Sequence, residues 1–238
     1  MNRLPSTDNV VYPETDGEPM AETDVHFAWM VRIRDQLDYH FREQRVYVAT
    51  NLLLYYVAGQ PQYAVAPDEF VVLDCDPGHR RVFKTWEEGR VPDFVLEVTS
   101  QSTRRRDELE KPDIYQRIGV REYFLYDPTA DYLDPPLCGF RRSRANRFEP
   151  LQPQLDGSLN AETLQLTLAL NNLDLVLRDG RTGEVLPTRA EAALRLLGHE
   201  EAARRREEAA RRREETARRQ AETHIAQLEA ELRQLRGE

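Results

Sequence analysis

The sequence has no long apolar run, so it offers no segment that could span a bilayer as a helix. The first residues of the chain carry a single basic residue, Arg3, and no apolar stretch, which argues against a secretory signal peptide. The expected location is therefore cytoplasmic, with no membrane partner.

Cysteine and histidine are scarce. Cys75 and Cys138 are the only cysteines, and a pair this far apart gives no sign of a disulfide framework. The five histidines are scattered without metal-ligand spacing, which excludes a Cys-His zinc cluster. His26, close to the start of an expected helix, is of weak interest, and the other histidines are incidental.

Basic residues are fewer than acidic ones: 33 against 42, which gives a formal net charge of −9. Proteins that bind DNA without sequence preference usually show a basic footprint, so this balance argues against nucleic acid as a partner. Local charge can override the balance, because metal ions neutralise acidic sites. Arginines that could form a basic rim are Arg80, Arg81, Arg104, Arg105, Arg106, Arg121, Arg141, Arg142, Arg144 and Arg147.

A length of 238 residues allows one globular domain of ordinary core size and an appendage. Residues 1–22 are polar, contain prolines and are expected to be irregular. Residues 23–186 are expected to form the globular domain. Residues 187–238 change sharply in composition and are expected to form a charged helical tail.

The expected element order is that of a mixed α/β domain. A helix capped by Thr23 or Asp24 should pack an apolar stripe on a sheet, and the stripe comprises Phe27, Met30, Ile33, Leu37 and Phe41. Strands are expected at 46–57, from residue 68, at 81–86, 93–100 and 122–126, and in short segments over 134–183 that extend the sheet. A helix ending at Gly119 should connect the strands 93–100 and 122–126, which would make that pair parallel.

The strand 93–100 carries an unusual acid. Its residues alternate with period two, so Glu97 shares a face with Asp93, Val95 and Thr99 and lies in the middle of the strand. A carboxylate in such a place needs a partner. Asp68, which also follows a proline at the start of an apolar strand, is the candidate, and two such oxygen ligands suit Mg²⁺ or Mn²⁺ better than zinc.

Two Pro-Asp strands and the segment after them form a longer pattern. The first is Pro67-Asp68-Glu-Phe-Val-Val, and the second is Pro92-Asp93-Phe-Val-Leu-Glu97-Val-Thr-Ser100. Asp107, Lys111 and Tyr115 follow, and then Gly119-Val-Arg-Glu-Tyr-Phe-Leu-Tyr-Asp127-Pro128. In these motifs the chain resembles the PD-(D/E)XK nuclease superfamily, and within it the Uma-two family of restriction-endonuclease-like proteins. The resemblance covers roughly residues 24–186 and is dense between 46 and 136.

This resemblance implies a restriction-endonuclease-like mixed sheet flanked by helices, and metal-dependent hydrolysis of nucleic-acid phosphodiesters. It implies Asp68 and Glu97 as ligands of Mg²⁺ or Mn²⁺. The superfamily's lysine slot, two residues after the strand acid, is occupied here by Thr99, so the Uma-two pattern moves that role to Lys111. There the ammonium could polarise the attacking water or stabilise charge on the phosphorane, and Asp107 would pair with Lys111.

The spacing of four between Asp107, Lys111 and Tyr115 would place them on one helix face. Pro112 offers an alternative, because a helix that begins there would leave Asp107 to Lys111 in a preceding turn. Arg104, Arg105 and Arg106 lie nearby in sequence and are weak candidates for phosphate contacts.

Each site residue also has a plainer interpretation. Asp68 and Asp93 could simply begin strands, Glu97 could form a structural ion pair, and Lys111 could be a solvated helix residue. Tyr115 and Tyr123 fit the buried faces of a helix and a strand, so a packing role in the core is favoured over a catalytic one. Two functions therefore stand: a metal-dependent endonuclease, with DNA before RNA as its substrate, and a catalytically silent nuclease-fold module for binding or assembly, which Thr99 favours.

The tail repeats a seven-residue unit, Glu-Glu-Ala-Ala-Arg-Arg-Arg, from residue 200, and then places Ile225, Leu228, Leu232 and Leu235 at the a/d spacing of a coiled coil. The alanines and the leucines do not share one register, which indicates a stutter. A solvated single helix held by Glu-Arg pairs, each worth about 0.3 kcal/mol, is one interpretation. Homo-oligomerisation through this tail, the core or both is the other.

Overall fold

The structure is a computed structural model that describes residues 10–15, 23–100 and 103–236. The chain divides into two compact units, Met1–Arg189 and Ala190–Glu238. Within the first, residues 10–15 form no helix or strand. The mixed α/β class expected from the sequence is confirmed.

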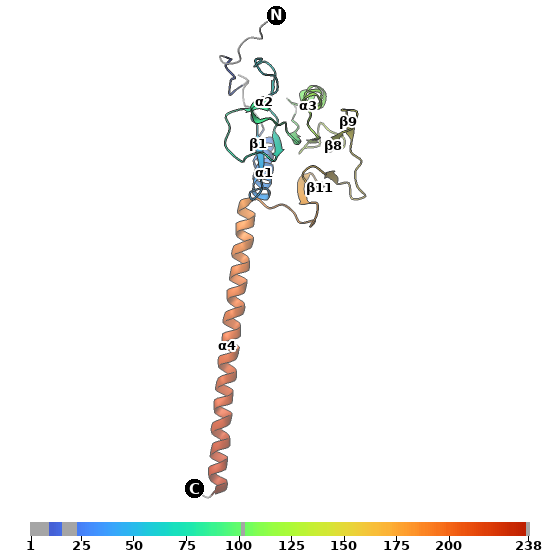
Figure 1. Cartoon of the computed structure of the whole chain (residues 1–238). Helices are drawn as coiled ribbons and strands as arrows, with labels where there is room; N and C mark the ends of the chain where they lie inside the picture. Colours follow the sequence, from blue (N-terminus) through green and yellow to red (C-terminus); the bar gives the residue numbers. More distant parts are fainter. Residues whose placement is uncertain (1–9, 16–22, 101–102, 237–238) are drawn as a thin grey trace, which may run out of the picture. The chain divides into compact units, whose positions relative to one another are not determined.

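The main sheet of the first unit has six strands in the order β1-β4-β6-β7-β8-β9. Their bounds are β1 Val46–Thr50, β4 Glu69–Leu73, β6 Phe94–Val98, β7 Glu122–Tyr126, β8 Leu137–Arg142 and β9 Phe148–Pro150. The pair β6 and β7 is parallel, as predicted, and the other neighbours are antiparallel. Figure 1 labels β1, β8 and β9 of this sheet. Helix α3 (Lys111–Ile118) makes the crossover between the parallel strands and ends at Gly119, whose φ of 103° suits glycine.

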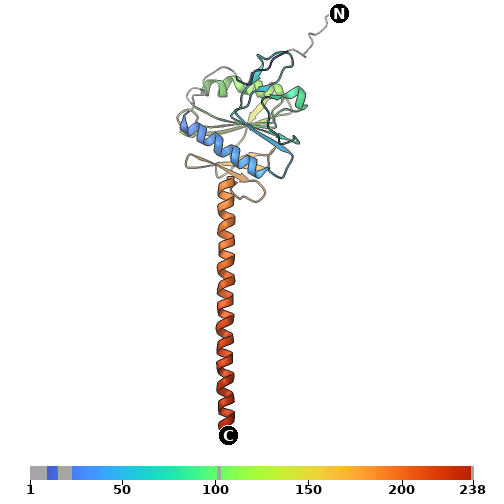
Figure 2. The same ribbon diagram turned by 90° about the vertical axis from the view of Figure 1, so that its left-hand side faces the viewer.

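Helix α1 (Asp24–His40) covers one face of the main sheet, and α3 covers the other (Figure 2). Thr23 caps α1 by accepting a hydrogen bond from the amide of His26 across 3.2 Å. The buried stripe of α1 begins at His26 and continues through Met30, Ile33 and Leu37. The prediction that Phe27 belongs to this stripe is wrong, because its side chain is 64% exposed; the spacing of four, three and four selects His26 instead.

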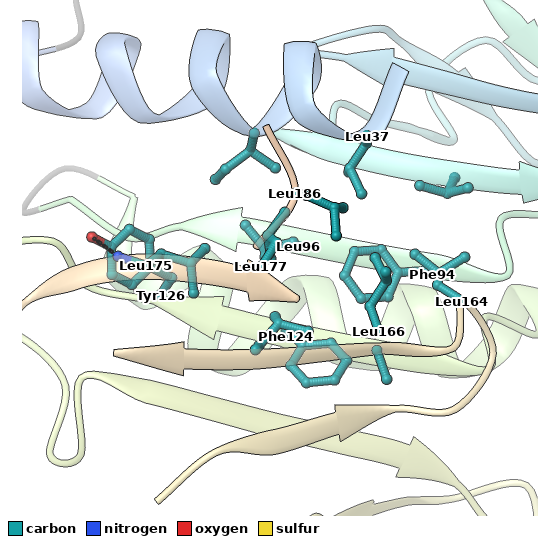
Figure 3. Close-up of a cluster of buried hydrophobic side chains, with 14 of the residues drawn as sticks. Leu37, Phe94, Leu96, Phe124, Tyr126, Leu164, Leu166, Leu175, Leu177 and Leu186 are labelled. Atoms are coloured by element: carbon teal, nitrogen blue, oxygen red, sulfur yellow. Dashed lines mark hydrogen bonds between the residues drawn. The ribbon is translucent and has the colours of Figure 1, made fainter. Parts of the chain in front are cut away.

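A second, three-stranded sheet packs on the α1 side of the main sheet. It is formed by β10 (Leu159–Ala161), β11 (Leu166–Asn171) and β12 (Asp174–Asp179) in antiparallel order. Its leucines, including Leu166 and Leu177, interdigitate with Phe94 and Phe124 (Figure 3). The expected extension of the main sheet is therefore correct for β8 and β9 and wrong for β10 to β12, whose alternating leucines bury one face against another sheet.

The expected long strand over residues 46–57 is broken. It ends at Thr50 because Asn51 takes a φ of 45°, and the chain resumes as β2 (Leu54–Tyr55) in another sheet. In that small sheet β2 lies between β3 (Ala64–Val65) and β5 (Phe83–Lys84). The expected strand 81–86 is likewise shortened to β5, and the short helix α2 (Thr85–Glu88) follows it.

Helix α4 runs from Arg189 to Arg236 and makes up the described part of the second unit, which begins at Ala190. Glutamates and arginines four residues apart pair along it, as in Arg211 with Glu207 at 2.7 Å and Arg218 with Glu222 at 2.8 Å. The side chain of Leu235 lies outside the described residues. Among the helices in the described ranges, none combines the length and apolar character that crossing a bilayer requires.

Candidate active site

The candidate site lies where the inner strand β4 begins and its neighbour β6 ends. Asp68 directly precedes β4, and Glu97 is the fourth residue of β6, which runs antiparallel to β4. Since side chains alternate along a strand, Glu97 points to the same face as Val95, the face that α3 covers. This alternation brings the carboxylate under the helix that carries Lys111 and Tyr115.

Glu97 is fully buried, and both of its carboxylate oxygens accept hydrogen bonds. Oε2 accepts from the ammonium of Lys111 at 2.8 Å and from the backbone amide of Asp68 at 3.0 Å. Oε1 accepts from the hydroxyl of Tyr115. The two acids expected to work together are thus in direct contact, through the amide of one and the carboxylate of the other.

Asp68 is held by two donors on one oxygen. Its Oδ2 accepts from the amide of Val98 at 2.8 Å and from Nε2 of His26 at 3.1 Å, whereas Oδ1 accepts no hydrogen bond from the described residues. Burial raises the pKa of Asp68, but the hydrogen bond from His26 and the charge of Lys111 outweigh burial and lower it below its ordinary value. Asp68 is therefore an ionised acid with one oxygen left to bind.

Lys111 is buried between two carboxylates. Its Nζ lies 2.8 Å from Oε2 of Glu97 and 2.9 Å from Oδ1 of Asp107. Asp107 belongs to a π-helical turn, η2 (Arg106–Glu110), that runs directly into α3. Both alternatives for this segment were partly right: α3 begins beside Pro112, and the preceding turn still keeps Asp107 and Lys111 on one side.

The charges of this cluster are unbalanced, because three acids share one lysine. Burial raises the pKa of Glu97 to about 8, against the opposing influence of the Lys111 charge. Burial also raises the pKa of Asp107. Burial alone would lower the pKa of Lys111, but the charges of Glu97 and Asp107 raise it above its ordinary value, so the lysine stays protonated.

Thr99, in the superfamily's lysine slot, is buried, and its hydroxyl has no hydrogen-bond partner among the described residues. Lys111 reaches Glu97 from the helix instead. The chain otherwise uses arginine throughout, and Lys84 is its only other lysine. A compact, flexible ammonium at this one buried position is chemically different from a planar guanidinium.

Asp93 takes the plainer of its two interpretations. Its carboxylate accepts from the amide of Leu73 at 2.8 Å and pairs with Arg121 at 3.2 Å. It therefore ties strands together and does not join the site. Arg104, Arg105 and Arg106 are exposed, and Arg104 pairs with Glu108 at 2.8 Å. No contact described in the structure links these three arginines to the carboxylates.

Three side chains contact the site although the sequence analysis did not assign them a functional role. His26 contacts Asp68, Tyr115 donates to Glu97, and the hydroxyl of Tyr123 donates to the backbone carbonyl of Asp107 at 2.6 Å. The position of Tyr115 four residues after Lys111 was a usable signal for it. The role of His26 had no comparable signal, because it approaches Asp68 from a helix 42 residues away in sequence.

The residues fit a hard divalent cation in part. Oδ1 of Asp68 and Oδ2 of Asp107 make no hydrogen bond to the described residues, and both atoms are oxygens of the type that Mg²⁺ selects. No group of three or more His, Cys, Asp or Glu side chains within the described ranges is arranged to hold a metal ion. Mg²⁺ commonly takes only one or two carboxylates and completes its shell with waters and substrate phosphates, which this arrangement allows.

A surface hollow of about 480 Å³ lies elsewhere, beside β1, where Arg34 and Arg80 line it. None of its lining residues belongs to the cluster around Lys111. This hollow therefore does not coincide with the candidate site, which is defined by its buried ionisable groups.

The comparison with protein-family models agrees with the sequence motifs. The model of the Uma2 family, described as "Putative restriction endonuclease", matches residues 2–178. No curated protein matches the chain. A crystal structure of a "putative nuclease belonging to DUF820" from Anabaena variabilis is similar at 13% identity and a TM-score of 0.44, over 63% of this chain and 80% of that one.

Proposed function

Because this chain belongs to the Uma2 family of restriction-endonuclease-like proteins, we propose that it is a metal-dependent endonuclease that hydrolyses phosphodiester bonds of nucleic acid. DNA is the first substrate to test. The observation that carries the proposal is the buried ammonium of Lys111, which lies 2.8 Å from Glu97 and 2.9 Å from Asp107 beside an ionised Asp68. Buried acids clustered around one lysine, with shifted pKa values, are typical of catalytic and ligand-binding sites.

Asp68 and Glu97 would hold Mg²⁺ or Mn²⁺. Asp68 would contribute the oxygen that His26 and Val98 leave open, and Glu97 would have to exchange one of its present donors for the metal. When bound, the metal would supply positive charge for the phosphate oxygens and make water easier to deprotonate. Metal charge beside Glu97 would also favour its ionised form, against the burial that now raises its pKa.

Lys111 would orient water or stabilise the negative charge that develops on the phosphate, since a protonated ammonium donates three hydrogen bonds. Asp107 positions it by contacting Nζ, and Tyr115 fixes the Glu97 carboxylate through Oε1. His26 positions Asp68 in the same way. The chain thus provides positioned charge and proton donors, which are the main contributions a protein makes to phosphodiester hydrolysis.

Exposed arginines offer the contacts to the phosphate backbone. Arg105 and Arg106 precede the buried Asp107 directly, and guanidinium groups match phosphate oxygens bidentately. Since the chain as a whole is acidic, with a net charge of −9, binding should be modest and should weaken steeply with salt.

The test is cleavage of supercoiled plasmid by the purified chain in Mg²⁺ or Mn²⁺. Asp68→Asn and Glu97→Gln should abolish nicking, and chelation should abolish it in the wild type. Glu110→Gln changes an exposed acid next to Lys111 and is the matched control that should keep activity. Equal nicking by all variants would identify a contaminating nuclease and remove the proposal's support.

Two specific observations favour a second function. Both oxygens of Glu97 are already occupied by donors, and Thr99 stands in the usual lysine slot. A network satisfied in this way could hold the fold without binding metal, which would make the chain a nucleic-acid-binding or assembly module. Retained DNA binding without divalent-ion binding or cleavage would support this function.

A further inference from the structure

Helix α4 contains one heptad register that the alanine repeat conceals. Leu197 precedes Ile225 by four whole heptads, so it shares the a position with Ile225 and Leu232. Leu228 occupies d in the same register, and so does Ala193. When the register of the C-terminal leucines is extended toward the N-terminus, its a and d positions exclude most alanines of the repeat and include Ala193 and Leu197 at the start of the helix.

The apolar side chains at both ends of α4 are exposed. Leu197 and Ile225 are each 56% exposed, Leu228 is 46% exposed and Leu232 is 52% exposed. A helix that places such residues at heptad spacing offers a seam for another helix. What could cover that seam is decided by the charges between the two ends.

Between the apolar ends, the a and d positions of this register, except Ala221, are charged and segregated by sign. The a positions carry arginines and the d positions carry glutamates: Arg204, Arg211 and Arg218 at a, and Glu200, Glu207 and Glu214 at d. In a parallel pair with matched register, each a residue faces its own copy, and so does each d residue. That pair would bring arginine against arginine and glutamate against glutamate in every one of these layers, which opposes association.

An antiparallel pair reverses this outcome, because a positions then face d positions of the second copy. A two-fold axis between Arg212 and Arg213 would place Arg211 opposite Glu214 of the second copy. The same axis generates the other layers: Arg218 with Glu207, Leu197 with Leu228, Ala193 with Leu232, Arg204 with Ala221 and Ile225 with Glu200. No layer of these joins like charges. At the apolar ends Leu197 faces Leu228 and Ala193 faces Leu232, whereas Ile225 faces the charged Glu200.

We propose that α4 binds α4 of a second copy of this chain as an antiparallel coiled coil centred between Arg212 and Arg213. The apolar ends supply the association, and the charged centre selects the orientation. In the single chain Arg211 and Arg218 pair with glutamates along their own helix, at 2.7 and 2.8 Å, so the facing glutamates of the second copy would compete with these contacts. The proposal concerns α4 alone and does not depend on nuclease activity.

Disulfide cross-linking of the full chain tests the orientation. In a background with Cys75→Ser and Cys138→Ser, Leu197→Cys and Leu228→Cys are prepared separately with tags of different mass, mixed and oxidised. The antiparallel pair predicts the mixed Leu197→Cys and Leu228→Cys dimer as the main product. Arg205→Cys, at an outward b position, sets the background of random collisions.

Two results from cross-linking and sedimentation would overturn the proposal. Dimers of each variant with itself, above the Arg205→Cys background, would show a parallel pair. A chain that sediments as a monomer at tens of micromolar, while circular dichroism shows an intact helix, would show a single helix without a partner.

Charge reversal gives an independent readout. Arg211→Glu should weaken dimerisation by about tenfold, and adding Glu214→Arg should restore it, because the two reversed charges face each other across the antiparallel seam. A parallel seam would keep like charges in both layers and show no restoration. Unchanged association in Arg211→Glu would contradict the proposal.

Discussion

The hydroxyl of Tyr123 donates a hydrogen bond to the backbone carbonyl of Asp107 across 2.6 Å. The reason lies in the helix turn itself. The amide of Lys111 donates to the carbonyl of Arg106, five residues back, so it does not serve Asp107. The next candidate donor would be residue 112, which is a proline without an N–H. The tyrosine therefore satisfies a carbonyl that the π turn and Pro112 leave open.

Replacing Tyr123 by Phe should lower the free energy of unfolding by about 1–3 kcal/mol, since the Asp107 carbonyl is left buried without a donor. It should also reduce cleavage, because the turn that positions Asp107 and Lys111 is loosened. Urea denaturation and initial rates of plasmid nicking measure the two effects.

Tyr126→Phe is the matched control. Tyr126 also lies on β7, and its hydroxyl donates to the carbonyl of Leu173 at 2.8 Å, away from the cluster around Lys111. A similar loss of stability with unchanged cleavage is expected. If both variants lost activity in proportion to stability, the hydrogen bond of Tyr123 would have no special part in the site.

Lys111→Met should reduce cleavage by about 100-fold or more, the range seen when a single charge-stabilising donor is removed. Lys111→Arg should not restore it, because a planar guanidinium cannot take the place of an ammonium held at 2.8 and 2.9 Å by two acids. Lys84→Met removes the chain's other lysine, which pairs with Glu87 near the surface, and should cleave normally. Full activity of Lys111→Arg would show that only positive charge is required there.

His26→Ala should weaken binding of Mn²⁺ about tenfold, because the Asp68 carboxylate loses the partner that orients it. His26→Gln can still donate from a side-chain amide and should recover part of the affinity. His40→Ala, at the other end of α1, is the control and should bind as the wild type does. Titration calorimetry gives the affinities, and equal values for all variants would remove His26 from the site.

The pKa of Glu97, raised to about 8, predicts how the stability of the metal-free chain depends on pH. Between an unfolded-state pKa near 4.3 and about 8, the folded chain keeps a proton that the unfolded chain has lost. The free energy of unfolding should therefore fall as pH rises through this window and level off above it. The raised pKa values of Asp107 and Glu69 act in the same direction.

Urea denaturation in the presence of a chelator, from pH 5.5 to 9, measures this dependence. Glu97→Gln removes the titrating group and should flatten the decline, because a neutral amide has no proton to lose. An identical pH dependence in the wild type and in Glu97→Gln would mean that Glu97 does not titrate in this range.

Several features of the fold followed from local pattern. The parallel pair β6 and β7 was predictable because a helix lies between two apolar strands, and Thr23 and Gly119 mark helix ends through their own chemistry. The separate sheet of β10 to β12 was not predictable, because alternating leucines show that one face is buried without showing against what. The break at Asn51 likewise depends on a backbone angle that the apolar run 46–57 hides.

The site divides in the same way. Asp68, Glu97, Asp107 and Lys111 were named from spacing and resemblance, and the structure places them in one cluster, although their roles stay predictions. His26 and Tyr123 reach that cluster through packing of α1 and β7, which no spacing in the sequence encodes. Asp93 shows the limit of the motif, since its Pro-Asp setting matches that of Asp68 while its carboxylate only bridges Leu73 and Arg121.

Binding of Mn²⁺ to the wild type and to two aspartate variants tests the central claim most directly. Titration calorimetry near pH 8 should show one ion bound per chain, no binding by Asp68→Asn, and binding close to wild type by Asp93→Asn, whose acid also follows a proline but lies outside the cluster. Absence of Mn²⁺ binding by the wild type, or equal binding by Asp68→Asn, would contradict the account.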